Sequence, residues 1–176
     1  MSVSPALLNP YQSIPRSAAV RRNWRYAFFG IAFVCCTSNN YFGGAHTGML
    51  LNAVWRAVLG SWHFELRGEV NEIMRKVGHF FGYGMIGIIF RNAWYATART
   101  LFAPTRQWTI AFAASLGVAS TFLVACLDEW HQSYCPGRVG SFRDVLIDTT
   151  GALLLNVLLW EWHARKRRLI LSVAGQ

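Results

Sequence analysis

The stretch that decides the fold is residues 128–138, DEWHQSYCPGR, and Arg143, Asp144 and Asp148 follow it closely. It places acids, a histidine, an amide and an arginine between two strongly apolar runs, residues 108–127 and 145–162. Ionisable groups are costly beside lipid, and they mark functional sites where they occur there. The stretch therefore predicts a polar site at the ends of two membrane-spanning helices.

The composition of the 176-residue chain favours a membrane protein of one domain. Hydrophobic residues make up 53% and charged residues 14% of the chain, whereas soluble domains carry about 25% charged residues. The net charge of +9 does not indicate a nucleic-acid partner, because the basic residues lie at the ends of apolar runs and form no separate basic region. The partner that we expect is the lipid bilayer.

Four apolar runs predict an all-α, polytopic membrane fold with about four transmembrane helices. They cover residues 24–42, 78–95, 108–127 and 145–162. The polar run 37–40 interrupts the first, although a span needs about 20 residues. The third is the cleanest, since it has no charge before Asp128. In the second, Gly78-xxx-Gly82 permits a close contact between helices.

The segment between the first two spans predicts one interfacial amphipathic helix over residues 50–62. Its apolar residues recur at helical spacing, with Asn52 and Arg56 on the opposite side. The domains that we expect are a cytoplasmic tail over residues 1–23, a membrane domain over residues 24–164 with a motif-bearing core over 75–162, and a basic cytoplasmic tail over residues 165–176.

The distribution of charge predicts that both termini lie in the cytoplasm. Of the 17 basic and 8 acidic residues, 11 basic residues and one acid fall on the side of the termini when the chain crosses four times. Basic residues accumulate on the cytoplasmic side of membrane proteins. The acid-rich connections then face outward.

This topology brings polar residues from three distant segments to the outer membrane face. Helical spacing places Lys76, His79 and Tyr83 on one face of the second span, and Asp144 with Asp148 on one face of the fourth. Lipid would penalise these faces, so we expect them to turn inward around a pocket of nearly balanced charge. The expected site residues are Lys76, His79, Tyr83, Asp128, Glu129, His131, Gln132, Arg138, Asp144 and Asp148.

The residue types allow several roles. We assign catalysis to Asp128, Glu129, His131 and His79, and substrate binding to Lys76, Tyr83, Gln132, Arg138, Asp144 and Asp148. Mixed nitrogen and oxygen ligands from the two histidines and the acids would suit zinc, but no HExxH motif occurs, and the cofactor stays unknown. The cations would hold a phosphate or neutralise the acids. The alternative is a polar network that only ties helix ends together.

The four cysteines show no metal-type CxxC spacing. We interpret Cys35, Cys36, Cys126 and Cys135 as small buried hydrophobes. If any pair forms a disulfide, Cys126 with Cys135 is the candidate, since both fall near the same membrane face.

The site residues resemble the signature of the VanZ-like membrane protein family. The resemblance lies in Lys76-x-x-His79-x-x-x-Tyr83, Asp128-Glu129-x-His131-Gln132, Pro136-Gly137-Arg138 and Asp144-x-x-x-Asp148-x-x-Gly151, and covers residues 75–162. It implies a bacterial, multi-span protein of the cell envelope, in the cytoplasmic membrane, without a settled biochemical activity. The family takes its name from a member associated with reduced susceptibility to the glycopeptide teicoplanin.

Three functions follow as hypotheses. The first is recognition of, or action on, a lipid-linked phosphate or glycan at the outer membrane face. The second is a membrane-embedded hydrolase in which Asp128 or Glu129 works with His131 as general base, with or without a metal. The third is a non-enzymatic membrane scaffold.

Overall fold

The computed structural model describes residues 16–38, 67–101, 106–135 and 139–174, together with positions 49, 53 and 57. These residues form four long helices and no strand, which confirms the all-α prediction for this part of the chain. The helices are α1 (Arg16–Thr37), α3 (Arg67–Leu101), α4 (Arg106–Gln132) and α5 (Phe142–Ala174). The predicted amphipathic helix over residues 50–62 lies almost entirely outside the described residues.

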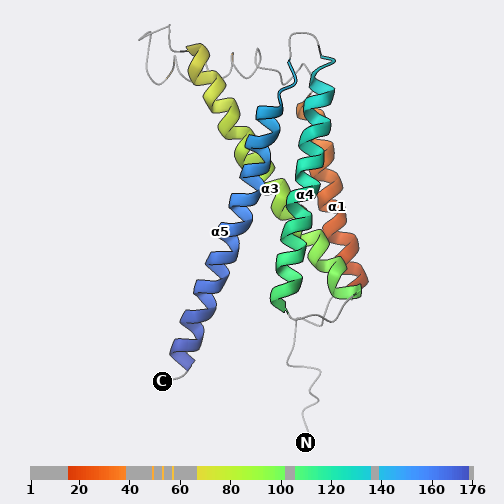
Figure 1. Cartoon of the computed structure of the whole chain (residues 1–176), viewed down its shortest axis with the longest axis vertical. Helices are drawn as coiled ribbons and strands as arrows, with labels where there is room; N and C mark the ends of the chain where they lie inside the picture. The colour runs from red at the N-terminus through yellow and green to blue at the C-terminus, as the bar shows by residue number, and fades with distance from the viewer. Residues whose placement is uncertain are drawn as a thin grey trace, which may run out of the picture.

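The four helices run alternately up and down the long axis of the molecule (Figure 1). α3 is central, since it contacts α1, α4 and α5. α1 and α4 end, and α3 and α5 begin, at the upper end of Figure 1. We call this the acidic end, because Asp128, Glu129, Asp144 and Asp148 lie in its helix turns; the opposite end, where α1 begins and α5 finishes, is the basic end.

Two helices extend into the segments expected as tails. α1 begins at Arg16, directly after Pro15, so that residues 16–23 are helical. α5 continues through the basic run 165–168 to Ala174. The physical reason is the same at both places: neither segment contains a proline or a glycine that would interrupt the backbone hydrogen bonds of a helix.

The turn between α4 and α5 is defined by its local hydrogen bonds. The amides of Asp144 and Val145 both donate to the Ser141 carbonyl oxygen, at 3.0 and 3.3 Å, so Ser141 caps the start of α5. Asp144 then lies in the first turn, where a negative charge complements the helix dipole. α4 closes with the Cys135 amide donating to the Gln132 carbonyl oxygen at 3.0 Å, and Pro136 follows in the sequence. α5 thus starts three residues earlier than the predicted span.

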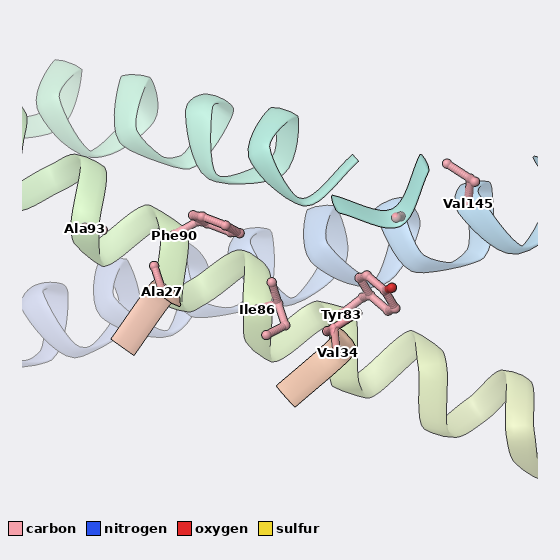
Figure 2. Packing of buried hydrophobic residues seen from close by; sticks show 8 residues of the cluster. Ala27, Val34, Tyr83, Ile86, Phe90, Ala93 and Val145 are labelled. Carbon is pink, nitrogen blue, oxygen red and sulfur yellow. The ribbon is translucent and has the colours of Figure 1, made fainter. Parts of the chain in front are cut away.

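The buried hydrophobic cluster joins the helices along α3. It comprises Ala27, Val34, Tyr83, Ile86, Phe90, Ala93, Ala125 and Val145 (Figure 2). At the basic end of this cluster Trp24 packs edge-on against Trp94, with ring centroids 5.1 Å apart, and its indole nitrogen donates to Thr97 Oγ1 at 3.0 Å. α1 is therefore attached to α3 by both apolar and polar contacts.

The closest helix contacts depend on glycines other than the predicted pair. A Cβ on Gly151 would collide with the Phe80 carbonyl oxygen, and one on Gly87 would lie 2.7 Å from Ala152 Cβ, so α3 and α5 cross with their backbones nearly touching. A Cβ on Gly117 would lie 2.8 Å from the Arg91 amide nitrogen, which brings α4 equally close to α3. By contrast, Gly78 and Gly82 are exposed and meet no described atom within 4 Å. The close contact that this pair permits is not made among the described residues, because the pair lies on the outer side of α3.

The cysteines are all free among the described residues. Cys126 and Cys135 are half-buried, whereas Cys35 and Cys36 are exposed on α1. The interpretation as buried hydrophobes is therefore wrong for the pair on α1, and the Cys126–Cys135 disulfide is not formed.

One helix segment in the described part of the chain is long and apolar enough to cross a membrane: Trp108–Gln132 in α4, with a mean hydropathy of 2.2. The prediction of four spans is not confirmed by this criterion. The other three helices contain charged residues at intervals, such as Arg91 in α3 and Asp148 in α5.

Candidate functional site

The acidic end brings together polar side chains from all four helices. The last turns of α4 supply Asp128, Glu129 and Gln132, and the first turns of α5 supply Asp144 and Asp148. α3 adds Arg75, His79 and Tyr83, and the end of α1 adds Ser38. Residues that are up to 110 positions apart therefore meet in one buried polar cluster.

Asp128 is the best-satisfied acid of this cluster. Its Oδ2 accepts the Tyr83 hydroxyl at 2.9 Å and the Gln132 side-chain amide at 2.8 Å, and its Oδ1 accepts the Ser38 hydroxyl. The donors come from α3, α4 and the end of α1, so one carboxylate connects three helices. All four residues are buried. A buried carboxylate with three donors contributes to stability, because the hydrogen bonds replace the water that it loses.

The carboxylate of Asp148, in contrast, has no hydrogen-bond donor. Its side chain is completely buried, with 0% exposure, and neither carboxylate oxygen accepts a hydrogen bond. The ring nitrogen His79 Nδ1 lies 3.5 Å from Asp148 Oδ1, which is an ion-pair distance without hydrogen-bond geometry. The His79 ring also stacks on Tyr83 with centroids 5.9 Å apart. His79 therefore packs on Tyr83, a donor to Asp128, and faces Asp148, which lacks donors.

Glu129 and Asp144 form the wall of the cluster next to the α4–α5 turn. Glu129 Oε2 accepts the Ser141 backbone amide at 2.8 Å, whereas its Oε1 is buried without a partner. Asp144 Oδ2 lies 3.5 Å from the guanidinium of Arg75, at the start of α3. The charges of Asp128, Asp144 and Asp148 all act on Glu129, so the four acids share one electrostatic environment.

Two expected site residues, Lys76 and His131, are not brought to this cluster. The Lys76 ammonium lies 2.6 Å from Glu72, one turn earlier on the same helix, and this hydrogen bond lowers the pKa of the exposed Glu72 carboxyl. His131 is exposed, whereas its neighbour Gln132 is buried. Arg138, a third expected site residue, lies outside the described residues, and Arg143, in the first turn of α5, is exposed.

Three residues of the cluster are absent from the predicted set. Ser38 belongs to the polar run that interrupts the first apolar segment, and Ser141 is a loop serine that acts through its backbone amide. Arg75 precedes the first motif by one residue. Helical spacing was a usable signal for Arg75, since it lies four residues before His79 on the same face. No comparable signal exists for the two serines.

The charge of the cluster departs from the expected balance. Among the described residues, the cluster contains Asp128, Glu129, Asp144 and Asp148 against Arg75 and His79 as the only groups able to carry positive charge. No group of three His, Cys, Asp or Glu side chains in the described part of the chain has the spacing to hold a metal ion. In the described part of the chain the cluster is therefore rich in acceptors and poor in cations.

The fold and the cluster define the class: an all-α bundle with apolar side chains over its outer surface and a buried acidic cluster at one end. A sequence model of the VanZ/LLP1 family matches residues 8–163, most of the chain, and the chain belongs to this family. The match confirms the resemblance and extends it to α1, which carries none of the motifs. Proteins of this family are generally membrane-associated. The chain matches no curated protein and no solved structure.

Proposed function

We propose that the protein crosses the bacterial cytoplasmic membrane several times, with both termini in the cytoplasm. Its acidic end would lie at the outer face and would recognise or act on a lipid-linked or phosphate-bearing envelope component. The observation that carries this proposal is the buried cluster itself. It gathers ionisable groups from four helices and leaves His79 Nδ1 and both Asp148 oxygens without hydrogen bonds. Buried polar groups without partners are rare, and a bound group or a catalytic role is one explanation for them.

The surface of the helices supports a lipid environment. Only 22% of the apolar window in Trp108–Gln132 is buried inside the protein, whereas the core helix of a soluble protein is mostly covered. On α1, the rings of Phe28, Phe29 and Phe33 are between 66% and 72% exposed. Apolar areas of this kind mark surfaces that contact protein or membrane. Helices of 22 to 35 residues also exceed the roughly 20 residues that a span needs.

The orientation can be tested by labelling single cysteines in a variant that lacks the native ones. A membrane-impermeant maleimide is expected to label Arg143→Cys in intact cells, and Arg168→Cys only after permeabilisation. The reason is that the basic residues gather at one end of the helices, and basic ends of membrane proteins face the cytoplasm. Labelling of both positions in intact cells would contradict the orientation.

The phosphate part of the proposal rests on Arg143, next to Asp144 in the sequence, and on Arg138 of the Pro136-Gly137-Arg138 motif. Arg143 is exposed beside Asp144, and guanidinium groups bind phosphate oxygens through two parallel hydrogen bonds. In nanodiscs, Arg143→Ala and Arg138→Ala are expected to weaken binding of polyprenyl phosphate about tenfold. Arg168→Ala at the basic end is the matched control, since it removes an exposed cation of the same helix. Equal affinity in all variants would remove the phosphate part.

A role in reduced susceptibility to teicoplanin belongs to the same proposal, and family membership supports it. Expression of the protein in a susceptible bacterium is expected to raise the inhibitory concentration of teicoplanin. Expression of Asp148→Asn at the same level is expected not to do so. If both variants leave the inhibitory concentration unchanged, this chain has no such role in that host.

A hydrolase is the second candidate. In this function His79 would act as the general base, and Asp148, which His79 faces, would orient its ring. Their 3.5 Å separation is typical of such pairs before substrate binds. This pair replaces His131, whose exposed side chain lies away from the cluster. Loss of turnover in His79→Gln, with retained binding, would establish this role. Retained phenotype in His79→Gln and Asp148→Asn would favour the non-enzymatic scaffold.

A further inference from the structure

Three carboxylate oxygens at the acidic end are buried and accept no hydrogen bond. They are Oδ1 and Oδ2 of Asp148 and Oε1 of Glu129. Asp148 is 0% exposed and Glu129 is 5% exposed. A buried acceptor without a donor is costly, so the free oxygens indicate a group that supplies donors.

The charge of the cluster narrows the nature of that group. Four acids face Arg75 and His79 in the described part of the chain, and the Arg75 guanidinium already lies 3.5 Å from Asp144. A protonated His79 would neutralise one further acid and would still leave an excess of negative charge. An anion alone would add to this excess, whereas a cation would reduce it.

The acceptors of Asp148 and Glu129 suit the hydrogen-bond donors of an organic cation. No three His, Cys, Asp or Glu side chains among the described residues have the spacing for a metal. A primary ammonium has different needs, since it carries three hydrogen-bond donors that diverge from one nitrogen. Asp148, at the start of α5, and Glu129, at the end of α4, offer acceptors for such donors, since both Asp148 oxygens and Glu129 Oε1 accept no hydrogen bond.

The surface of α3 beside His79 is open among the described residues. His79 is 23% exposed, so one part of its ring reaches the surface while Nδ1 faces Asp148. Gly78 precedes His79, and Gly82 lies nearly one turn beyond it; both are exposed, and neither has a described atom within 4 Å of its Cβ position. The helix surface beside His79 is therefore bare backbone, which leaves space for a ligand group.

We propose that Asp148 and Glu129 bind the primary ammonium group of a zwitterionic envelope component that carries a phosphate as well. This inference rests on the proposed function, because it names the chemistry of the component bound at the same end. The ammonium lies against the acids, and the phosphate lies outside it, toward the exposed Arg143. Such a ligand neutralises both parts of the site, the acidic interior and the basic rim.

The experiment measures binding of three short-chain lipid probes to the full chain in detergent. The probes carry phosphoethanolamine, phosphocholine, which lacks N–H donors, or phosphate without an amine. Phosphoethanolamine is expected to bind about tenfold more tightly than either of the others, the scale of one charge-assisted hydrogen bond. Free ethanolamine and inorganic phosphate, measured separately, distinguish a lipid headgroup from a soluble ligand.

Two variants connect this preference to the proposed residues. Asp148→Asn is expected to abolish the preference for phosphoethanolamine, and Glu161→Gln, an exposed acid on the same helix, is expected to retain it. Gly82→Leu is expected to weaken the binding of phosphoethanolamine by filling the bare strip, and the open space at this position allows it to fold.

The outcomes separate the inference from the proposed function. Equal binding of all three lipid probes, unchanged by Asp148→Asn, overturns the ammonium site and leaves phosphate recognition intact. Binding of ethanolamine that phosphate does not improve supports the ammonium site and contradicts the proposed phosphate-bearing component. Absence of binding for every probe overturns both.

Discussion

Asp128 and Asp148 are buried aspartates at the same end of one bundle, and their surroundings differ in kind. The Asp128 carboxylate accepts hydrogen bonds from Ser38, Tyr83 and Gln132, and so joins α1, α3 and α4. The Asp148 carboxylate, between α3 and α5, accepts none and faces His79 at 3.5 Å. The first region has what a structural network needs. The second region keeps a buried charge without donors, which a purely structural site would avoid.

The largest expected effect comes from the backbone contact that encloses the Asp148 region. A Cβ on Gly151 would collide with the Phe80 carbonyl oxygen, which cannot move away as a side chain could. We expect Gly151→Ala to lower the free energy of unfolding by more than about 3 kcal/mol. Thermal and chemical unfolding in one detergent measures this.

The matched control is Gly82→Ala on the facing helix, where a Cβ meets no described atom. This change is expected to raise stability by up to about 1 kcal/mol, because alanine favours the helix over glycine. Similar destabilisation in both variants would mean that the α3–α5 contact has no special role.

The next effect tests the structural nature of the Asp128 region. Asp128→Leu leaves three buried donors without an acceptor, and we expect a loss of about 2 to 3 kcal/mol in stability. Asp128→Asn is expected to cost about 1 kcal/mol or less, since its amide oxygen can accept from Tyr83 and Gln132 while the Ser38 hydroxyl accepts from its nitrogen. Unfolding measurements on both variants decide this. Equal losses would show that the charge of Asp128, and not its acceptor geometry, holds the helices.

The third prediction concerns Asp148, where we expect an effect on binding and little effect on stability. Asp148→Asn removes a buried charge and no hydrogen bond, so its stability should stay within about 1 kcal/mol of the parent or rise. Its preference for a phosphoethanolamine probe should fall about tenfold. Glu161→Gln, on the exposed basic end of the same helix, should change neither property. A large loss of stability in Asp148→Asn would assign this residue to the structural network as well.

The sequence predicts the difference between the Asp128 and Asp148 regions only in part. Periodicity is sufficient for the helices, and the polar faces of the second and fourth apolar runs place Tyr83, His79 and Asp148 correctly toward the bundle. The reason is that apolar and polar positions alternate with the helical period, whichever helix faces them. Periodicity does not reveal which carboxylate oxygen accepts a hydrogen bond, because that depends on the side chains of the neighbouring helix.

Particular residues show where periodicity fails. Arg75 and Lys76 are adjacent cations near one face of α3, yet Arg75 meets Asp144 and Lys76 turns to Glu72. Each cation pairs with the acid that lies nearest to it. Asp144 is close to Arg75 only because the turn capped by Ser141 places the start of α5 there. His131 and Gln132 likewise share the end of α4, and only Gln132 faces Asp128. A one-residue step rotates a side chain by about 100°, so motif membership alone cannot separate the two.

The smallest effect is expected at Glu129, whose carboxylate is partly satisfied, unlike those of Asp128 and Asp148. One of its oxygens accepts the Ser141 amide at 2.8 Å, and the other has no partner. In Glu129→Gln the amide oxygen can take over the Ser141 bond, so stability should change by less than about 1 kcal/mol. One of three proposed acceptors is lost, so the preference for phosphoethanolamine should fall roughly threefold, less than in Asp148→Asn. A fall equal to that of Asp148→Asn would make the two acids one functional unit, and an unchanged preference would restrict the ammonium site to Asp148.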